Sequence, residues 1–493
     1  MSQRRRPRGR TPDKLAMIAL GVVGLVVIAL AAVATIVRPG DAPATVTPPR
    51  PSAVARTLPT PPPTTALPAS PIASPVAPST VACGERCLVR VADTAAERDR
   101  LGRFGVRPVY AHGGELWAAF PEAKLRDLLP AGPVAVLGDA ADTFNLYMMR
   151  IPEGTDPAPV TTSGEMVDRI GNQFLMRVPQ VPFHAGELTG AGIAVEKVPP
   201  YPATTPINRV TLPEIGDVGA LASAVSVENL NGTIADLQSM GGEAGGSGSR
   251  YYASPGNVRA AEYLYRRFDG YGLRTWYDDF ITDDGYHALN VVGEIPGRDP
   301  SKVYLVLSHF DSINDAGGSD APGADDNATG VATTLELARI LSGYQLAHPV
   351  RFLATNAEEV GIQGAPAFAA HAVEEGVPIA GAFNVDAVGS AANGQLLILN
   401  ADENSIWLED ILVDMNDRFG LGQELRVRQN PAIVADDNSM RAYGFPTVLL
   451  AREMYGWSAL HHTPGDVIGT LDLDNVRSTT QLVALALGSL VEE

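Results

Sequence analysis

The chain has 493 residues, of which 45% are hydrophobic and 6% aromatic, enough for two or three domains with a core of their own. Its formal net charge is −19 and its pI is about 4.9. This acidic balance argues against nucleic acid as a partner, because phosphates attract a basic surface.

The N-terminus combines a basic cluster with a long apolar run. Six Arg and Lys side chains lie in residues 1–14, and Leu15–Val37 follows with 23 uncharged residues. A helix of that length spans roughly 35 Å, enough to cross a bilayer. The positive-inside rule predicts a cytoplasmic basic tail at 1–14, a transmembrane signal anchor at 15–37 and an extracytoplasmic remainder, tethered to the cell membrane by a single pass. A cleaved signal peptide is the alternative, since Ala32-Val33-Ala34 resembles a cleavage site.

Residues 38–80 have the composition of a stalk. Twelve prolines lie between Asp41 and Thr80, among Ala, Thr, Ser and Val. Such a segment buries too little apolar surface to form a core, so we expect a disordered, extended spacer.

Cys83 and Cys87 are the only cysteines of the chain. In an exported protein they predict a local disulfide. Two cysteines with no neighbouring histidine are too few for a zinc site.

Residues 81–215 are predicted to form an N-terminal α/β domain with a weak internal repeat. Its first half runs CLVRVAD, TAAERDRLGRFG, GELWAAFP, AKLRDLLPAG and VAVLGD; its second runs NLYMMRIP, SGEMVDRIG, NQFLMRVP, HAGELTGAG and IAVEKV. Periodicity and turn signals predict β-α-β-α-β for both. The segment is either an accessory binding domain or a pro-like segment. We expect structural or surface roles for its single histidines, His112 and His184.

Residues 216–493 alternate apolar runs with helical patterns. KVYLVLSHFD, PVRFLATNAEE, IAGAFNVDAVG and PTVLLARE predict buried strands, whereas VATTLELARILSGY and SIWLEDILVDMNDRFG predict helices. This alternation is typical of an α/β fold with a mixed, mostly parallel sheet and helices on both faces.

Chemically reactive side chains gather where these strands end. Nine carboxylates and imidazoles follow strands or lie in nearby loops: His309, Asp311, Asp325, Asp326, Glu358, Glu359, Asp386, His461 and His462. Ligands of such sheets bind beyond the carboxyl ends of the strands, so we expect one metal cage. Three or four carboxylates exceed the charge of one divalent ion, which favours two. Oxygen and nitrogen ligands without thiolate fit zinc, and a shared carboxylate would hold two ions about 3.5–4 Å apart.

The motifs HFD, GADDNATG, NAEEVG, NVDAVG and HTPGD occur in this order. In order and spacing they resemble peptidase family M28, the co-catalytic dizinc aminopeptidases. The resemblance covers about residues 218–493 and leaves the first 215 or so unexplained.

The resemblance implies a role for each matching residue. His309 and Asp386 would bind one Zn²⁺, Glu359 and His462 the other, and Asp326 would bridge the two. Glu358 would be the general base toward a zinc-bridging hydroxide. Asp311 would hydrogen-bond the far nitrogen of His309 and so fix its tautomer.

Some assignments within the motifs have alternatives. Asp325 is the alternative to Asp326, and His461 the alternative to His462. Asn327 and Thr329 are expected to shape a helix start. Structural or surface roles are expected for the remaining histidines of this region, His287, His348 and His371.

The chain departs from the family pattern in the stretch AIVADDNSMRAYG. Family members often carry Ser-Asp-His there, and Asn438 stands in the place of the His, after Asp437. Because that region borders the substrate pocket in the family, we expect Asp437, Asn438 and Tyr455 to contact substrate.

We therefore expect a membrane-anchored, outward-facing dizinc aminopeptidase that acts on peptides with a free N-terminus. An M28-like carboxypeptidase is an alternative, with Arg441 or Arg452 anchoring the substrate carboxylate. A glutaminyl cyclase is less favoured, because cyclases use one zinc and this chain keeps both His309 and Asp386. An inactive binding ectodomain is a third alternative, although no expected metal ligand is missing.

Overall fold

The computed structural model describes residues 83–128, 134–140, 144–200, 209–240, 248–317, 320–391, 396–428, 434–452 and 459–492. The predicted tail, anchor and stalk lie outside these ranges. Within them, no helix combines the length and the hydropathy that a membrane crossing requires. Cys83 and Cys87 form a disulfide, as the sequence predicts.

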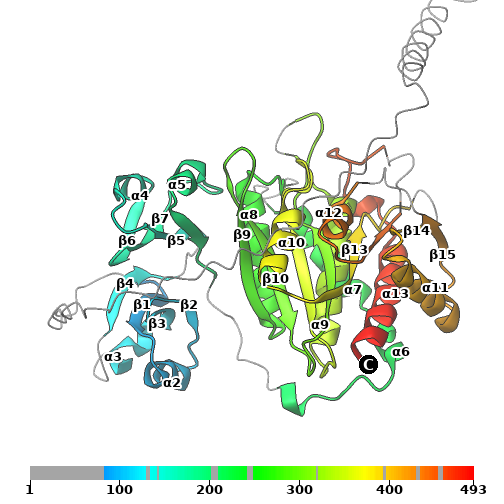
Figure 1. The fold of residues 1–493 in the computed structure, drawn as a ribbon, viewed down its shortest axis with the longest axis horizontal. Coiled ribbons are helices and arrows are strands. Elements are labelled where there is room, and N and C mark those ends of the chain that lie inside the picture. Colours follow the sequence, from blue (N-terminus) through cyan, green and yellow to red (C-terminus); the bar gives the residue numbers. More distant parts are fainter. Residues whose placement is uncertain are drawn as a thin grey trace, which may run out of the picture. The chain divides into compact units, whose positions relative to one another are not determined.

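The N-terminal domain contains two four-stranded antiparallel sheets with equivalent strand orders, β2-β3-β1-β4 and β6-β7-β5-β8. The first repeat comprises β1 (Arg86–Ala92), α2 (Ala95–Arg103), β2 (Pro108–His112), β3 (Glu115–Pro121), η1 (Glu122–Lys124), α3 (Leu125–Leu128) and β4 (Ala135–Asp139). The second comprises β5 (Leu146–Arg150), α4 (Ala158–Thr162), β6 (Glu165–Ile170), β7 (Gln173–Arg177), α5 (Gly186–Gly190) and β8 (Ala194–Lys197). Each repeat thus has the order β-α-β-β-α-β (Figure 1).

The predicted order β-α-β-α-β is therefore wrong by one strand in each repeat. SGEMVDRIG, predicted as a helix, contributes β6, which pairs with β7 around a turn at Gly171. Residues 108–112 form β2 against β3 in the first repeat. Pairing with a neighbouring strand decides the conformation of such short segments, because local strand propensity is weak.

The larger domain is built on an eight-stranded mixed sheet of order β15-β14-β16-β13-β11-β12-β10-β9. Four of its seven strand pairs are parallel, and the antiparallel ones lie toward the two edges. The strands are β9 (Arg274–Ile281), β10 (His287–Ile295), β11 (Val303–His309), β12 (Val350–Thr355), β13 (Ile379–Asp386), β14 (Leu396–Asn400), β15 (Glu424–Arg428) and β16 (Thr447–Ala451). This confirms the predicted mixed α/β sheet.

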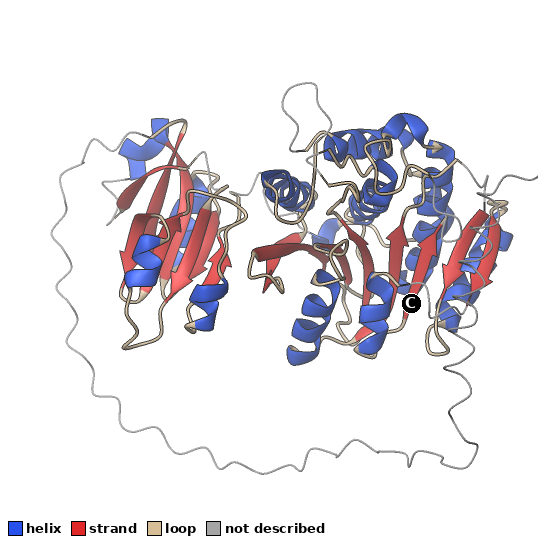
Figure 2. Ribbon diagram, turned by 90° about the horizontal axis from the view of Figure 1, so that it is seen from above, coloured by secondary structure: helices blue, strands red, loops and turns tan. Residues whose placement is uncertain are grey.

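Helices cover both faces of this sheet (Figure 2). Tyr304 and Val306 of β11 pack into one core, and Leu305 and Leu307 into the other, because successive strand residues point to opposite faces. The helices are α6 (Val218–Ser223), α7 (Val227–Gln238), α8 (Pro255–Gly270), α9 (Gly330–Leu341), α10 (Gly364–Glu374), α11 (Ile406–Phe419), α12 (Asp436–Ala442) and α13 (Leu473–Glu492), with short turns η3 (Arg209–Thr211), η4 (Ala324–Thr329) and η5 (Ile468–Thr470).

The second repeat of the N-terminal domain packs against α8, β9 and β10. The N–H groups of Ala185 and Gly186 donate to the carbonyl of Gly285 at 2.9 and 3.0 Å. Val258 of α8 and Ile281 of β9 join the apolar cluster of this repeat. The contact therefore combines main-chain hydrogen bonds with shared apolar burial.

Candidate metal centre

The candidate site lies where three neighbouring parallel strands end. β11 ends at His309, β13 ends at Asp386, and Glu358 and Glu359 follow β12 after a short connection. A pocket opens at this edge of the sheet, as expected for an α/β fold. Its lining residues are His309, Asp326, Glu358, Glu359, Ile362, Asp386, Ala387, Val434, Ala435, Ala451, His461 and His462.

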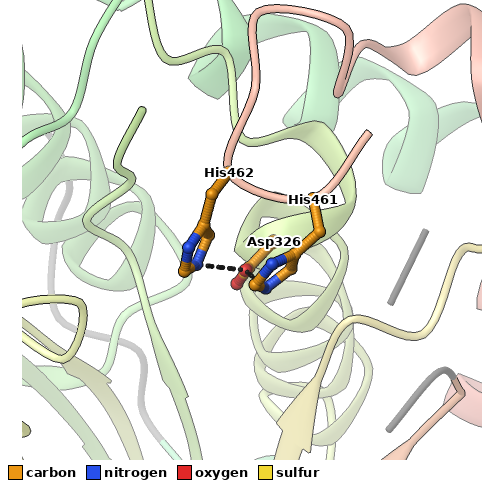
Figure 3. Close-up of side chains that lie close together, drawn as sticks. All are labelled: Asp326, His461 and His462. Atoms are coloured by element: carbon orange, nitrogen blue, oxygen red, sulfur yellow. Dashed lines mark ion pairs between the residues drawn. The ribbon is translucent and has the colours of Figure 1, made fainter. Parts of the chain in front are cut away.

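Asp326 stands at the centre of the site with its two carboxylate oxygens in different surroundings. Oδ1 lies 3.1 Å from His309 Nε2, while Oδ2 lies 2.6 Å from His461 Nε2 and 3.3 Å from His462 Nε2. Figure 3 shows the imidazole rings of His461 and His462 turned toward the Asp326 carboxylate. A carboxylate with ligand partners on both sides has the arrangement that a bridge between two metal ions requires.

Two further carboxylates complete the two sides. On the first side, Asp386 Oδ1 lies 3.4 Å from His309 Nε2. On the second side, Glu359 Oε2 lies 2.8 Å from His462 Nε2. Asp386 Oδ1 and Glu359 Oε1 are buried and have no hydrogen-bond donor. A bound cation would satisfy buried carboxylate oxygens that accept no hydrogen bond. The surrounding ligand atoms are carboxylate oxygens and imidazole nitrogens without sulfur, a combination that fits zinc.

The structure brings both adjacent histidines to Asp326. The sequence predicts His462 as the ligand, and it is His462 whose Nε2 contacts Glu359 as well as Asp326. The ring of His461 stacks on it, with centroids 3.6 Å apart. His461 Nε2 thus lies close to the same oxygen of Asp326 as His462 Nε2. The sequence predicted only one of the two histidines at this carboxylate.

Asp325 faces away from the pocket. Its Oδ1 accepts a hydrogen bond from the N–H of Gly389 at 2.7 Å, and its carbonyl accepts one from the hydroxyl of Thr329. Burial raises the pKa of Asp325 to about 8. Of the two adjacent aspartates, Asp326 is the one that reaches the pocket.

Asp311 orients the loop that carries Glu358 and Glu359. Its two carboxylate oxygens each accept a hydrogen bond, at 3.2 Å, from the N–H of Glu358 and of Glu359. Its Oδ1 lies 3.6 Å from Nδ1 of His309, beyond hydrogen-bond length. The predicted hydrogen bond to His309 is thus absent from this structure, whereas the contact with the two glutamates was not predicted.

The pKa values of the site residues are shifted because several carboxylates are buried together with few positively charged groups. Burial raises the pKa of Glu358 well above its usual range and that of Glu359 to about 8. Burial acts to lower the pKa of His462, but hydrogen bonds to Asp326 and Glu359 raise it to about 11. A raised pKa makes a carboxylate a stronger base, which suits Glu358 to proton transfer.

Left-handed backbone is concentrated around the pocket. The non-glycine residues with positive φ in the described part of the chain are Ala357 (55°), Ile362 (53°), Ala387 (46°) and His462 (53°). Three of them line the pocket, and Ala357 precedes Glu358. Such conformations cost about 1–3 kcal/mol each and persist where surrounding structure enforces them, typically at functional sites.

Two of the three residues predicted to contact substrate, Asp437 and Asn438, do not line the pocket. Asp437 is fully buried in α12 and forms an ion pair with Arg441, one helical turn further on. Asn438 also accepts a hydrogen bond from Arg441, and neither residue lines the pocket. Val434 and Ala435, just before α12, line it instead. Tyr455 lies outside the described residues.

The two arginines considered as carboxylate anchors are held elsewhere. Arg441 also donates to the carbonyls of Asn400 and Thr447. Arg452 is 2% exposed and donates to the Val388 and Asn475 carbonyls. Neither lines the pocket, so the structure offers the carboxypeptidase alternative no anchor at these two positions.

Some residues that hold the site in place were not predicted from the sequence. The carboxylate of Asp466, the last residue of HTPGD, accepts the N–H groups of Asp325 and Asp326 at 2.8 and 3.0 Å. Asn257 and Asn356 exchange two amide hydrogen bonds at 2.8 and 2.9 Å, which fixes the start of the loop that carries Glu358. The aspartate of HTPGD was visible as part of a motif; the asparagine pair carried no such signal.

Comparison with known proteins agrees with this geometry. Residues 290–487 match the model of Peptidase family M28. A probable zinc metalloprotease of Pyrenophora tritici-repentis is 28% identical over 212 residues, 38% of this chain and 42% of that protein. A probable leucine aminopeptidase of Trichophyton verrucosum is 27% identical over 289 residues, 56% of this chain and 75% of that protein. The chain thus spans less than half of the metalloprotease relative.

A solved structure extends the likeness of fold to the N-terminal domain. LapB from Legionella pneumophila aligns over 83% of this chain and 100% of its own, with a TM-score of 0.50 and 17% identity. At that identity the likeness concerns fold alone. The family match covers the strand ends and loops that carry His309, Asp326, Glu359, Asp386 and His462. Residues 290–487, the part of the chain that holds the candidate metal centre, are thus similar to peptidase family M28.

Proposed function

We propose that the protein is a dizinc aminopeptidase that releases N-terminal residues from peptides. The observation that carries the proposal is the contact of Asp326 with His309 on one side and His462 on the other. His309 in turn lies beside Asp386, and His462 beside Glu359. These five residues would hold two zinc ions, with Asp326 shared. The names of the metalloprotease and aminopeptidase relatives support the same chemistry.

Zinc held by these five residues would supply a Lewis acid toward the scissile carbonyl and would lower the pKa of a water molecule, so that hydroxide is available near neutral pH. Glu358 lines the pocket, and its raised pKa suits it to take the proton of that water and pass it to the leaving amine. Asp311 holds the backbone of Glu358 and Glu359 together, so the proton acceptor and the metal ligand keep a fixed relation.

The charge of the pocket favours an aminopeptidase over a carboxypeptidase. Four carboxylates line it and, among the described lining residues, no Lys or Arg does. Individual carboxylate oxygens could accept hydrogen bonds from a substrate amine, whereas a terminal carboxylate needs a cationic anchor, which the described lining lacks. The apolar wall of Ile362, Val434 and Ala435 would receive the side chain of the residue to be released.

We further propose that Leu15–Val37 anchors the chain in the cell membrane, with the peptidase domain on the extracytoplasmic side. The basic cluster before this apolar run supports the orientation. The disulfide between Cys83 and Cys87 supports an oxidising compartment. Protease accessibility of the domain in intact cells, before and after permeabilisation, tests the orientation; protection in intact cells would refute it.

The activity is tested with one peptide in free and N-acetylated forms, on zinc-free protein and after zinc is restored. We expect zinc-dependent cleavage of the free form alone, at its first peptide bond. Equal cleavage of both forms would exclude an aminopeptidase. Release of ammonia from an N-terminal glutamine peptide, without cleavage, would instead identify a cyclase.

A further inference from the structure

Arg250 is the most completely buried cation beside the candidate metal centre. It precedes α8, has 0% exposure and lies in the stretch SGSRYYASPGN. Its guanidinium donates four hydrogen bonds, all to main-chain carbonyls: Nε to Phe310 at 2.7 Å, Nη1 to Leu237 at 3.1 Å and Pro322 at 2.6 Å, and Nη2 to Gly323 at 2.8 Å.

Three of these four acceptors lie on the two segments that carry the central ligands, and the fourth, Leu237, belongs to α7. Phe310 follows His309 directly, and Pro322 and Gly323 precede Asp326 by four and three residues. The N–H of Arg250 also donates to Ser312 Oγ, whose hydroxyl donates to the carbonyl of Ala321. One planar guanidinium thus connects the end of β11 with the start of η4.

The surroundings of Arg250 leave little room for another arrangement. Gly323 has φ 54°, and a Cβ there would lie 2.8 Å from Arg250 Nη2. The carbonyl of Arg250 accepts a hydrogen bond from Asn257 at 2.8 Å, which ties it to α8. Burial lowers the pKa of Arg250 to about 10, so the group stays charged at neutral pH, close to Asp311, Asp326 and Asp466.

We propose that Arg250 is a positioning residue of the metal centre: it fixes the spacing between the backbone of His309 and that of Asp326, and so prepares both for zinc. The inference rests on the proposed zinc function but concerns a residue outside the ligand set. A lysine keeps the charge but offers no planar fork for two separate segments. Arg250→Lys therefore separates the geometric role from the charge.

The test measures zinc affinity of the full chain by competition with a chelator, together with thermal unfolding of the zinc-free protein. Residues that hold metal ligands in place typically contribute about 10–100-fold to metal affinity, and we expect a loss of that size in Arg250→Lys. The absorption spectrum of the cobalt-substituted protein should change as well, because the ligand geometry changes. Arg250→Met adds loss of the charge, and if it does not fold, Arg250→Lys decides alone.

Arg209→Lys is the matched control. Arg209 also donates to two main-chain carbonyls, those of Ser342 and Gly272, but far along the chain from every ligand segment. We expect lower thermal stability and unchanged zinc affinity in this variant. Wild-type affinity in Arg250→Lys, or an equal loss in Arg209→Lys, would overturn the inference alone. A wild-type chain that binds no zinc would overturn the proposed function, and the inference with it.

Discussion

The carboxylate of Asp466 accepts the backbone N–H of Asp326 at 3.0 Å, so an aspartate 140 positions later in the chain holds the central residue of the site. The same carboxylate accepts the N–H of Asp325, and the side chain is 4% exposed. These hydrogen bonds from main-chain N–H groups to the Asp466 carboxylate hold the backbone of Asp326, and so fix the direction in which its side chain points.

Asp466→Ala should therefore weaken zinc binding by about 10–100-fold, with a parallel fall in kcat/KM at limiting zinc. Chelator competition measures the affinity. Asp472→Ala is the control, because Asp472 accepts an N–H in the same way from Asp474 but on an exposed turn. Zinc affinity equal to that of the wild type in Asp466→Ala would contradict this role.

Substitution of the two adjacent glutamates should have different effects, one on turnover and the other on zinc binding. Glu358→Gln removes the proton acceptor and should lower kcat by about 10²–10⁴-fold while zinc stays bound. Glu359→Gln should instead reduce zinc binding, because it removes a ligand whose Oε2 contacts His462. Turnover and zinc content are measured on the same preparations. Full turnover by Glu358→Gln would remove this residue from the mechanism.

The ion pair of His371 and Asp278 predicts a pH-dependent contribution to stability. The hydrogen bond from His371 Nδ1 to Asp278, at 2.6 Å, raises the pKa of His371 above 6.5 in the folded protein. A raised histidine pKa stabilises the fold fully below pH 6.5, and this contribution is lost as the pH rises through the folded-state value. The side chain is 45% exposed, so screening keeps the effect below about 1 kcal/mol.

Urea unfolding of wild type and His371→Gln at a series of pH values checks this prediction. The difference in unfolding free energy should be largest below pH 6.5 and should shrink on the alkaline side. A difference that is constant with pH would show that the pair contributes by packing alone.

The N-terminal domain should support the peptidase domain rather than block it. No residue of 83–200 lines the described pocket, and the second repeat instead shares an apolar cluster with Val258 and Ile281. Deletion of residues 83–200 should therefore lower the thermal midpoint without raising kcat/KM. A several-fold gain of activity on deletion would instead identify an inhibitory pro-segment.

The gathering of the candidate ligands could be predicted from sequence because these residues follow strand ends. His309, Asp386 and the Glu358–Glu359 pair come after apolar runs that form neighbouring strands, so topology alone brings them together. The partners of Asp326 follow from the same rule together with the family motifs.

Contacts with main-chain atoms could not be predicted. The guanidinium of Arg250 donates only to carbonyl groups, which every residue possesses, so no pattern of side chains marks its partners. Asp437 shows the opposite error: an aspartate beside the expected substrate region becomes part of α12 and pairs with Arg441 inside the protein. Short strands such as β6 were missed because their partners, not their own residues, determine them.

The positive φ angles around the pocket have a consequence for protein engineering. Glycine adopts such angles without strain, so Ala387→Gly or Ala357→Gly would look attractive in a search for heat-resistant variants. The same change would release the backbone beside Asp386 or Glu358, and a looser ligand or proton acceptor would offset the gain. At the four non-glycine positions with positive φ, a gain in stability would be offset by a loss of turnover. A thermostable form is better sought at the sheet edge formed by β15.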